Sequence, residues 1–193
     1  MNHLCSLVEK YRKKDGIIDA FGLILYTDEH ANIIKVLRDD DFWRSFHEIS
    51  GPEWGIFSIK PKKGYFGYPE LGQGQIGFMI PIWREPCENT MLLNEFNLES
   101  TKDLPLFVIF THLGNEILQV QIKIDDSSID KTYASIKEMI KVVSSAIKNI
   151  ILENYKNPEG VFSALQLAIN NYKEMKRIKK GISFHLWMKR LLT

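Results

Sequence analysis

Hydrophobic and polar residues follow two different periods along the chain, and together these periods predict a mixed series of strands and helices. Short apolar runs over 22–26 and 54–59 predict two strands. Between these runs, apolar residues recur at helical spacing, at Ile33, Ile34, Leu37, Phe42, Trp43, Phe46 and Ile49. A strand, a helical segment and a second strand in this order predict a β-α-β unit, which is nearly always right-handed and has parallel strands.

Polar residues divide this helical segment. Thr27 or Asp28 precedes its first apolar position, and either side chain is expected to cap the first helix. The run Asp39-Asp40-Asp41 is expected to break the helix and to restart it before Phe42. The run lacks the alternating Asp and the glycine of a calcium loop, so we interpret it as a solvated, capping turn.

The second half of the chain predicts a hairpin that is led by a proline. A short helix over 91–96, capped by Thr90, precedes Pro105. Because proline cannot donate to a sheet ladder, Pro105 is expected to mark the entrance of the strand that continues over 107–110. A second strand over 117–124 follows, and its polar residues Gln119, Gln121 and Lys123 alternate with apolar ones. This alternation is typical of a half-exposed, antiparallel edge strand.

Helices are expected at both ends of the chain. A short helix is expected over 3–14 and a long amphipathic helix over 129–155. The run Asn157-Pro158-Glu159-Gly160 is expected to stop the long helix, and two further helices are expected over 161–178 and 183–192.

An insertion over 61–88 differs from the rest of the chain. It combines glycines and prolines with aromatic residues, which are rare in disordered segments, and 76–83 is expected to form an extra strand. We expect a single domain over 1–193 with a core over about 21–155 and a helical extension over about 158–193.

Composition and charge exclude several classes of function. The 193 residues carry a net charge of +1, so no global field points to nucleic acid. No segment has the pattern of a secretory signal or of a membrane span, and Cys5 and Cys87 have no redox or metal spacing, which leads us to expect a cytoplasmic protein. The charge is uneven, because residues 160–193 carry +6 and the rest of the chain therefore carries −5.

The order of predicted elements resembles the thioredoxin fold. Phe96-Asn97-Leu98, followed by Leu104–Phe110, is similar to the thioredoxin pattern of an aromatic and an aliphatic residue before a proline-led strand. Gly114–Ile117 lies where thioredoxins make their last hairpin turn. The resemblance covers roughly 21–155 and implies a thioredoxin-like α/β fold with a mixed sheet and a cis Leu104–Pro105 bond.

One departure from that family decides the expected chemistry. Thioredoxins place Cys-x-x-Cys at the start of the first core helix, where the helix N-terminus stabilises the thiolate. This chain has Thr27-Asp28-Glu29-His30-Ala31 at that position, so thiol–disulfide exchange by the family mechanism is excluded.

Other candidate chemistry is weak. Gly72–Gly77 satisfies G-x-G-x-x-G, but prolines surround it and no helix follows, so we reject a dinucleotide site. His30 with Asp28 or Glu29, or alternatively Cys87, offers a site of rebuilt catalysis. Because Thr27, Asp28 and Glu29 are residue types expected at any helix N-terminus, we favour their ordinary capping role. Acidic residues near Cys87 oppose thiolate formation, so we interpret it as an ordinary small side chain. We expect neither a metal nor a cofactor.

We therefore interpret the chain as a non-catalytic module that binds a protein or a peptide in a groove beside the proline-led strand. The candidate contacts are Thr27, His30, Leu104 and Pro105, with Tyr65, Phe66, Tyr68 and Trp83 in the insertion. An enzyme with rebuilt chemistry is the alternative. The basic C-terminal end is expected to pack on the body or in a homodimer rather than to bind an anionic surface.

Overall fold

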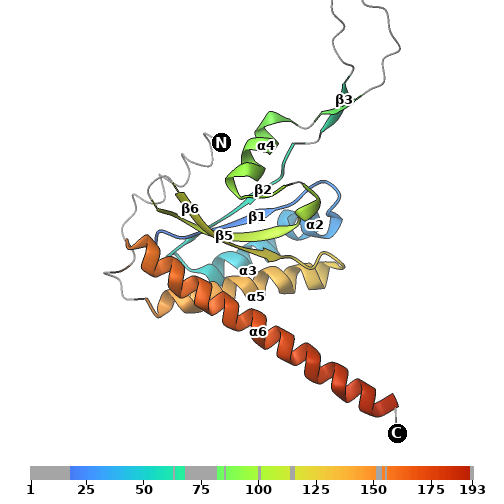
Figure 1. Ribbon diagram of the computed structural model, residues 1–193, viewed down its shortest axis with the longest axis vertical. Helices are drawn as coiled ribbons and strands as arrows, with labels where there is room; N and C mark the ends of the chain where they lie inside the picture. The colour runs from blue at the N-terminus through green and yellow to red at the C-terminus, as the bar shows by residue number, and fades with distance from the viewer. Residues whose placement is uncertain are drawn as a thin grey trace, which may run out of the picture.

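The protein is a mixed α/β structure in which helices cover both faces of one four-stranded sheet (Figure 1). The computed structural model describes residues 18–62, 64–67, 82–84, 86–99, 101–113, 116–150, 154 and 156–191. The helix expected over 3–14 lies outside the described residues.

The sheet consists of β1 (Phe21–Leu25), β2 (Gly55–Ile59), β5 (Leu106–Leu113) and β6 (Glu116–Lys123), in the order β2-β1-β5-β6. β1 and β2 are parallel, which confirms the predicted β-α-β unit. β5 is antiparallel to both β1 and β6, and β6 lies at an edge, as its polar alternation predicts. Pro105 directly precedes β5, and the Leu104–Pro105 peptide bond is cis.

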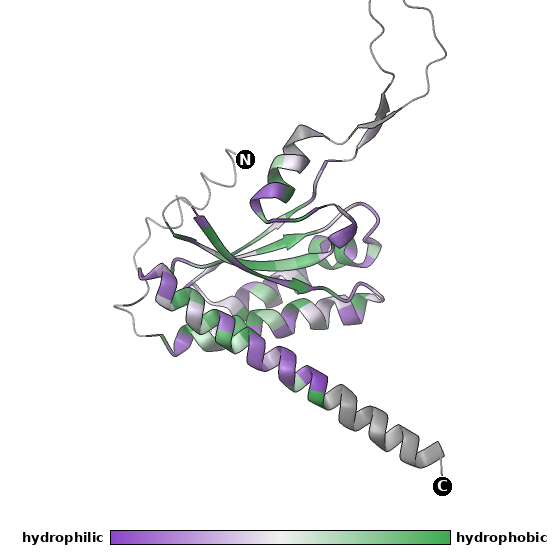
Figure 2. Ribbon diagram, viewed as in Figure 1, coloured by the Kyte–Doolittle hydropathy of each residue, from purple (hydrophilic) through white to green (hydrophobic). Residues whose placement is uncertain are grey.

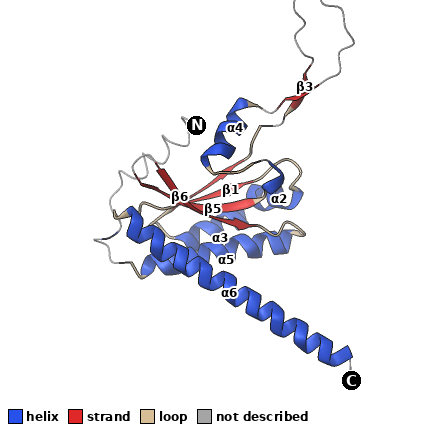
Figure 3. Cartoon of the chain, viewed as in Figure 1, coloured by secondary structure: helices blue, strands red, loops and turns tan. Residues whose placement is uncertain are grey.

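Helices α2 (Ala31–Arg38), α3 (Asp40–Ser50), α5 (Ile129–Lys148) and α6 (Pro158–Leu191) lie on one side of the sheet, and α4 (Cys87–Glu95) lies on the other (Figures 1 and 3). None of these helices combines the length and the apolar character that crossing a membrane requires, as far as the described residues extend.

The central strand β1 is buried on both faces, which explains its uninterrupted apolar sequence. Phe21, Leu23 and Leu25 pack with residues of the α4 side, whereas Ile24 belongs to the larger core beneath α2, α3, α5 and α6. The hydrophobic colouring of the central strands in Figure 2 follows this burial.

The cap of α2 differs from the prediction. The N-cap residue is His30, no side chain of the loop caps the helix, and the expected caps Thr27 and Asp28 do not contribute. Instead, the Oδ1 of Asp126 accepts the backbone N–H of Ile33 at 2.9 Å. A side chain that is distant in the sequence therefore performs the role that local sequence signals assign to the loop.

The acidic turn between α2 and α3 agrees with the prediction. Asp39 ends α2 and begins α3, and its Oδ1 accepts the backbone N–H groups of Asp41 and Phe42 at 3.0 and 3.2 Å. The acidic run is thus a capping turn between two helices.

Three other helix boundaries were predicted wrongly. α4 begins at Cys87, so Thr90 lies inside the helix and does not cap it. α5 ends at Lys148, with Asn149 as its C-cap, rather than at residue 155. α6 is one helix where two were expected, because Pro158 suits the first helical turn and a glycine inside a helix costs only about 1 kcal/mol.

A second, two-stranded antiparallel sheet pairs β3 (Tyr65–Gly67) with β4 (Ile82–Arg84) and extends away from the main sheet (Figure 1). Of the strand expected over 76–83, residues 76–81 lie outside the described part. A short 3-10 helix, η1 (Thr101–Asp103), leads into Leu104.

Candidate functional site

The register of the sheet brings the predicted loop and proline to one end of the molecule. Leu25 pairs with Ile59 of β2 and also with Leu106 of β5. The loop after β1, which contains Thr27 and His30, therefore lies at the same end of the sheet as Pro105. In α/β sheets the carboxyl ends of parallel strands are the usual place for a ligand, so this end is the first to consider.

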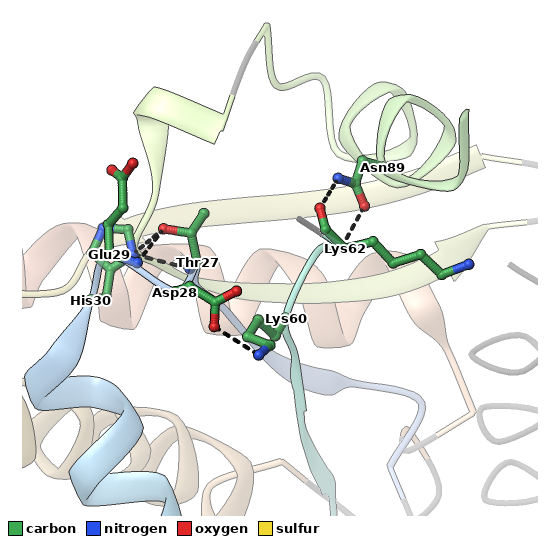
Figure 4. A network of polar contacts seen from close by, with 7 residues as sticks. All are labelled: Thr27, Asp28, Glu29, His30, Lys60, Lys62 and Asn89. Carbon is green, nitrogen blue, oxygen red and sulfur yellow. Dashed lines mark hydrogen bonds and ion pairs between the residues drawn. The ribbon is translucent and has the colours of Figure 1, made fainter. Parts of the chain in front are cut away.

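His30 holds the loop together. Its Nδ1 accepts the backbone N–H of Thr27 at 3.0 Å and lies 2.8 Å from the Thr27 hydroxyl (Figure 4). Because a backbone N–H can only donate, Nδ1 acts as an acceptor and the proton of the neutral ring lies on Nε2. The Thr27 hydroxyl also accepts the backbone N–H of Glu29 at 3.3 Å. Both predicted residues are thus engaged in the structure of the loop.

The acidic neighbours of His30 do not assemble with it. Asp28 pairs with Lys60, with 2.8 Å between Oδ1 and Nζ. The carboxylate of Glu29 points away from Asp28 and Lys60 (Figure 4). The Asp28–Lys60 pair is about half exposed, and such pairs contribute little to stability. Within the described residues, no group of three or more His, Cys, Asp or Glu side chains could hold a metal ion.

The backbone of Leu104 is already occupied by the chain itself. Its N–H donates to the carbonyl of Thr101 at 3.2 Å, and its carbonyl accepts the ammonium of Lys123 at 2.8 Å. Lys123 also donates to the carbonyl of Asp103 at 2.6 Å. The side chains of Leu104 and Pro105 are buried. These groups therefore stabilise the entrance of β5, and an extended partner cannot pair with them without displacing Lys123.

Asp125 and Asp126 follow β6 at this same end. The hydroxyl and the backbone N–H of Ser127 donate to Asp125 Oδ1 at 2.6 and 3.1 Å, and these bonds lower the pKa of the Asp125 carboxyl. The Asp126 carbonyl accepts the side-chain amide of Asn32 at 2.7 Å. Asp126 thus connects the end of β6 with the start of α2, whereas the Asp125 carboxylate stabilises the turn that leads into α5.

Among the described residues, the insertion contributes one aromatic side chain to the surface. Tyr65 is 57% exposed, Phe66 pairs in register with Trp83, and Tyr68 lies outside the described residues. The buried Asn89 of α4 exchanges two hydrogen bonds with the backbone of Lys62, at 2.8 and 2.6 Å (Figure 4). This pair ties α4 to the segment that leads into β3.

The outer edge of β2 offers backbone groups that Leu104 does not. Among the described residues, only β1 pairs with β2. The carbonyls of Glu53 and Ile59 accept N–H groups from Ile18 and Tyr26, so they face β1. Because backbone direction alternates along a strand, the N–H and C=O groups of Ile56 and Ser58 point to the outer edge.

The sequence of β2 does not protect this edge. Edge strands usually carry a charge, a proline or a bulge that prevents pairing with another chain. β2 reads Gly-Ile-Phe-Ser-Ile, with no charged residue and no proline. The outer edge of β2 is therefore suited to pair with a further strand.

A groove of about 600 Å³ lies beside the start of β2. Its lining includes Trp43, Phe46, His47, Trp54, Gly55 and Ile56. Trp43 is 37% exposed, whereas Trp54 is buried and its indole N–H donates to the carbonyl of Ser50 at 3.0 Å and to the Ser144 hydroxyl at 3.2 Å. One wall of the groove is therefore rigid and one aromatic ring remains accessible to a ligand.

Neither the edge nor the groove was predicted from the sequence. The uncharged run of β2 was a usable signal for the edge, whereas the groove depends on how α3 packs against the start of β2. Comparisons with protein-family models, with curated proteins and with solved structures found no match to this chain.

Proposed function

We propose that this chain is a thioredoxin-like protein without the redox motif and that it functions as a non-catalytic module for binding a protein or a peptide. Support for the architecture comes from the strand order β2-β1-β5-β6 and from the position of Pro105 before β5. The absence of a thiol between Thr27 and Ala31 argues against thiol–disulfide exchange at the start of α2.

The proposed binding site is the outer edge of β2 together with the groove beside it. The observation that carries the proposal is that Ile56 and Ser58 direct their backbone groups outward along an uncharged edge, which is bordered by a groove that contains the exposed ring of Trp43. A partner segment in extended conformation would add a strand there. Main-chain hydrogen bonds supply affinity in this mode, and pockets for alternate side chains supply specificity.

The chemistry of the groove indicates which segment would bind. The exposed ring of Trp43 favours an apolar or aromatic side chain of the partner, and Asp40 and Arg44 offer polar contacts. Each main-chain hydrogen bond contributes about 1 kcal/mol, so the edge alone gives weak binding and the groove must add to it. A proline-free segment with one aromatic residue fits both requirements.

The test uses an array of proline-free peptides of about eight residues, the length of an ordinary strand. Ser58→Pro removes the outward N–H, and it spares the ladder because proline is tolerated where the N–H of an edge strand faces solvent. We expect this variant to lose at least about tenfold in affinity for the selected peptides, as Trp43→Ala should. Ser58→Thr keeps the N–H and is the matched control.

A loss of peptide binding supports the proposed site only if the variants are folded. Circular dichroism and the urea midpoint should show that Ser58→Pro and Trp43→Ala remain folded. If both folded variants bind the selected peptides as tightly as the wild type, the β2 site is wrong. An array on which no peptide binds the wild-type protein contradicts the proposed function itself.

A further inference from the structure

Helix α6 is much longer than the surface on which it packs. The first half of the helix contacts the body through three side chains that are 0–1% exposed, Val161, Leu165 and Ile169. Tyr172 then donates to the carboxylate of Glu138 on α5, and Lys176 lies 3.3 Å from the same group. Beyond this point the helix continues to Leu191 and projects away from the body (Figure 1).

A second face of α6 exposes apolar side chains. Leu167, Met175 and Ile178 are 63%, 56% and 59% exposed. Neither Met175 nor Ile178 packs on the body, contrary to the packing expected for the basic end. Helical spacing places all three residues within an arc of about 100°, and the same arc contains Ala164, Ala168 and Asn171. We call these six residues the α6 stripe.

The α6 stripe is a continuous apolar surface that a partner can reach. No charged residue between 158 and 178 falls within its arc. Of the six large apolar side chains that are exposed in the described part of the chain, three belong to the stripe. Single exposed apolar residues are ordinary, but a group of them on one face marks an interaction surface. The stripe is turned by about 110° from the buried face, so a partner can bind it while α6 stays on the body.

Charge indicates that a second copy of the chain covers the stripe, with its helix running in the opposite direction. Residues 173–191 carry a net charge of +6, whereas residues 158–172 contain Glu159 as their only charged residue and carry −1. Two parallel copies of α6 would place the basic halves side by side, and their charges would repel. In an antiparallel pair, each basic half lies along the half of the other helix that carries −1.

The sizes of the side chains also favour an antiparallel pair. The small residues Ala164 and Ala168 lie in the first half of the stripe, and the large residues Met175 and Ile178 lie at its other end. When the helices run in opposite directions, Ile178 of one copy can face Ala168 of the other, and Met175 can face Asn171. Large residues then fit against small ones, and a single polar residue such as Asn171 helps to fix the register.

We propose that the α6 stripe is a dimer interface in which the α6 helices of two copies pack antiparallel about a two-fold axis. Each contact then occurs twice. The exposed ion pair between Glu174 and Arg177, at 3.0 Å, lies outside the arc and remains at the rim of the interface. Such a dimer carries two β2 sites, so a partner with two suitable segments would bind it more tightly than a partner with one.

The experiment measures the mass of the full chain by light scattering over a range of concentrations, and we expect a dimer. Met175→Ser and Ile178→Ser should each raise the dissociation constant of the dimer at least about tenfold, because each substitution removes apolar burial twice. Met91→Ser is the matched control, since Met91 is likewise exposed (48%) on a helix, but on α4. This control should leave the dissociation constant unchanged.

Cysteine cross-linking tests the direction of pairing. In a chain that carries Cys5→Ser and Cys87→Ser, the double variant A168C/I178C should form a disulfide between two copies under mild oxidation. Neither Ala168→Cys nor Ile178→Cys alone should do so. In the antiparallel pair the two copies of residue 178 are about 15 Å apart along the helix axis, which is too far for a disulfide.

The dimer is wrong if the wild-type chain stays a monomer at every concentration, and binding of the monomer to RNA or to anionic vesicles would then identify another occupant of the stripe. It is also wrong if Met175→Ser weakens a dimer no more than Met91→Ser does. Efficient cross-linking of Ile178→Cys alone would show parallel helices and contradict the antiparallel pair. None of these substitutions changes the β2 site, so a monomeric chain leaves the proposed peptide binding unaffected.

Discussion

Asp126 and Ile33 are 93 residues apart, yet the carboxylate of Asp126 accepts the backbone N–H of Ile33 at 2.9 Å and so caps the first turn of α2. The same oxygen accepts the hydroxyl of Thr132 in α5 at 3.2 Å. One side chain thus connects the start of α2 to the start of α5. The loop of Thr27 and His30, which leads into α2, is held by this connection at the end of the sheet.

Replacing Asp126 should therefore destabilise the fold. Asp126→Ala is expected to lower the free energy of unfolding by about 1–2 kcal/mol, because the N–H of Ile33 loses its acceptor near a helix N-terminus. Asp126→Asn keeps a side-chain acceptor and should lose less. Urea denaturation measures both, with Glu48→Ala on the exposed surface of α3 as the control, for which a change within about 0.5 kcal/mol is expected. Equal losses in Asp126→Ala and Glu48→Ala would contradict the role of the cap.

Lys123 is expected to hold the entrance of β5. Lys123→Met removes the ammonium that binds the carbonyls of Asp103 and Leu104, and we expect a loss of about 1–2 kcal/mol in stability. Lys123→Arg should retain part of the contact. Lys141→Met, on the exposed side of α5, is the control and should change stability little. If Lys123→Met is as stable as this control, the carbonyl of Leu104 is available to a partner. That result would favour the groove beside Pro105, which was predicted from the sequence, as the binding site.

Gly22 leaves space for the indole of Trp54. A Cβ at this position would lie 2.8 Å from Trp54 Cζ3 and 3.0 Å from Phe107 Cζ, which are both parts of rigid, buried rings. Gly22→Ala is therefore expected to cost about 1–3 kcal/mol of stability. Because Trp54 also lines the groove, the variant should weaken peptide binding as well. Tryptophan fluorescence would detect a displaced Trp54 ring, and urea denaturation would measure the loss of stability. An unchanged free energy of unfolding would show that the two rings move aside without destabilising the fold.

The contact between Tyr172 and Glu138 predicts a dependence on alkaline pH. Burial, followed by the hydrogen bond to Glu138, raises the pKa of the Tyr172 hydroxyl above its usual value. The pKa of Tyr172 in the folded protein exceeds its value of about 10 in the unfolded chain. The contribution of this hydroxyl to the stability of the fold is therefore fully present below about pH 10, and it is lost as the pH rises through the pKa of the folded state. The stability difference between the wild type and Tyr172→Phe should decrease over that range. A difference that stays constant up to about pH 11 would show that this hydroxyl is not coupled to folding.

The strands could be predicted from the sequence because their signals are local. The apolar runs that form β1 and β2, and the position of Pro105 before β5, depend on a few adjacent residues. The order of these elements was enough to expect a mixed sheet with a parallel pair and a hairpin. The cis isomer of the Leu104–Pro105 bond was expected only from the resemblance, because the residues themselves favour trans.

The helix ends and the binding edge could not be predicted in the same way. Thr27 and Asp28 are good capping residues, but Asp126 takes their place from across the fold. Thr90 is likewise a good cap that falls inside α4. That β2 pairs with β1 alone among the described residues depends on how the strands are arranged, and the groove depends on the packing of Trp43 and Trp54, so neither is encoded in a short segment.

Amide hydrogen exchange along β2, measured by NMR in the free protein and with a selected peptide, tests the proposed binding edge most directly. In the free protein we expect the N–H groups of Ile56 and Ser58 to exchange fast, while those of Phe57 and Ile59, which face β1, exchange slowly. The peptide should slow Ile56 and Ser58 at least about tenfold and leave Phe57 almost unchanged. Rates for Ile56 and Ser58 that are the same with and without the bound peptide would contradict strand addition at β2.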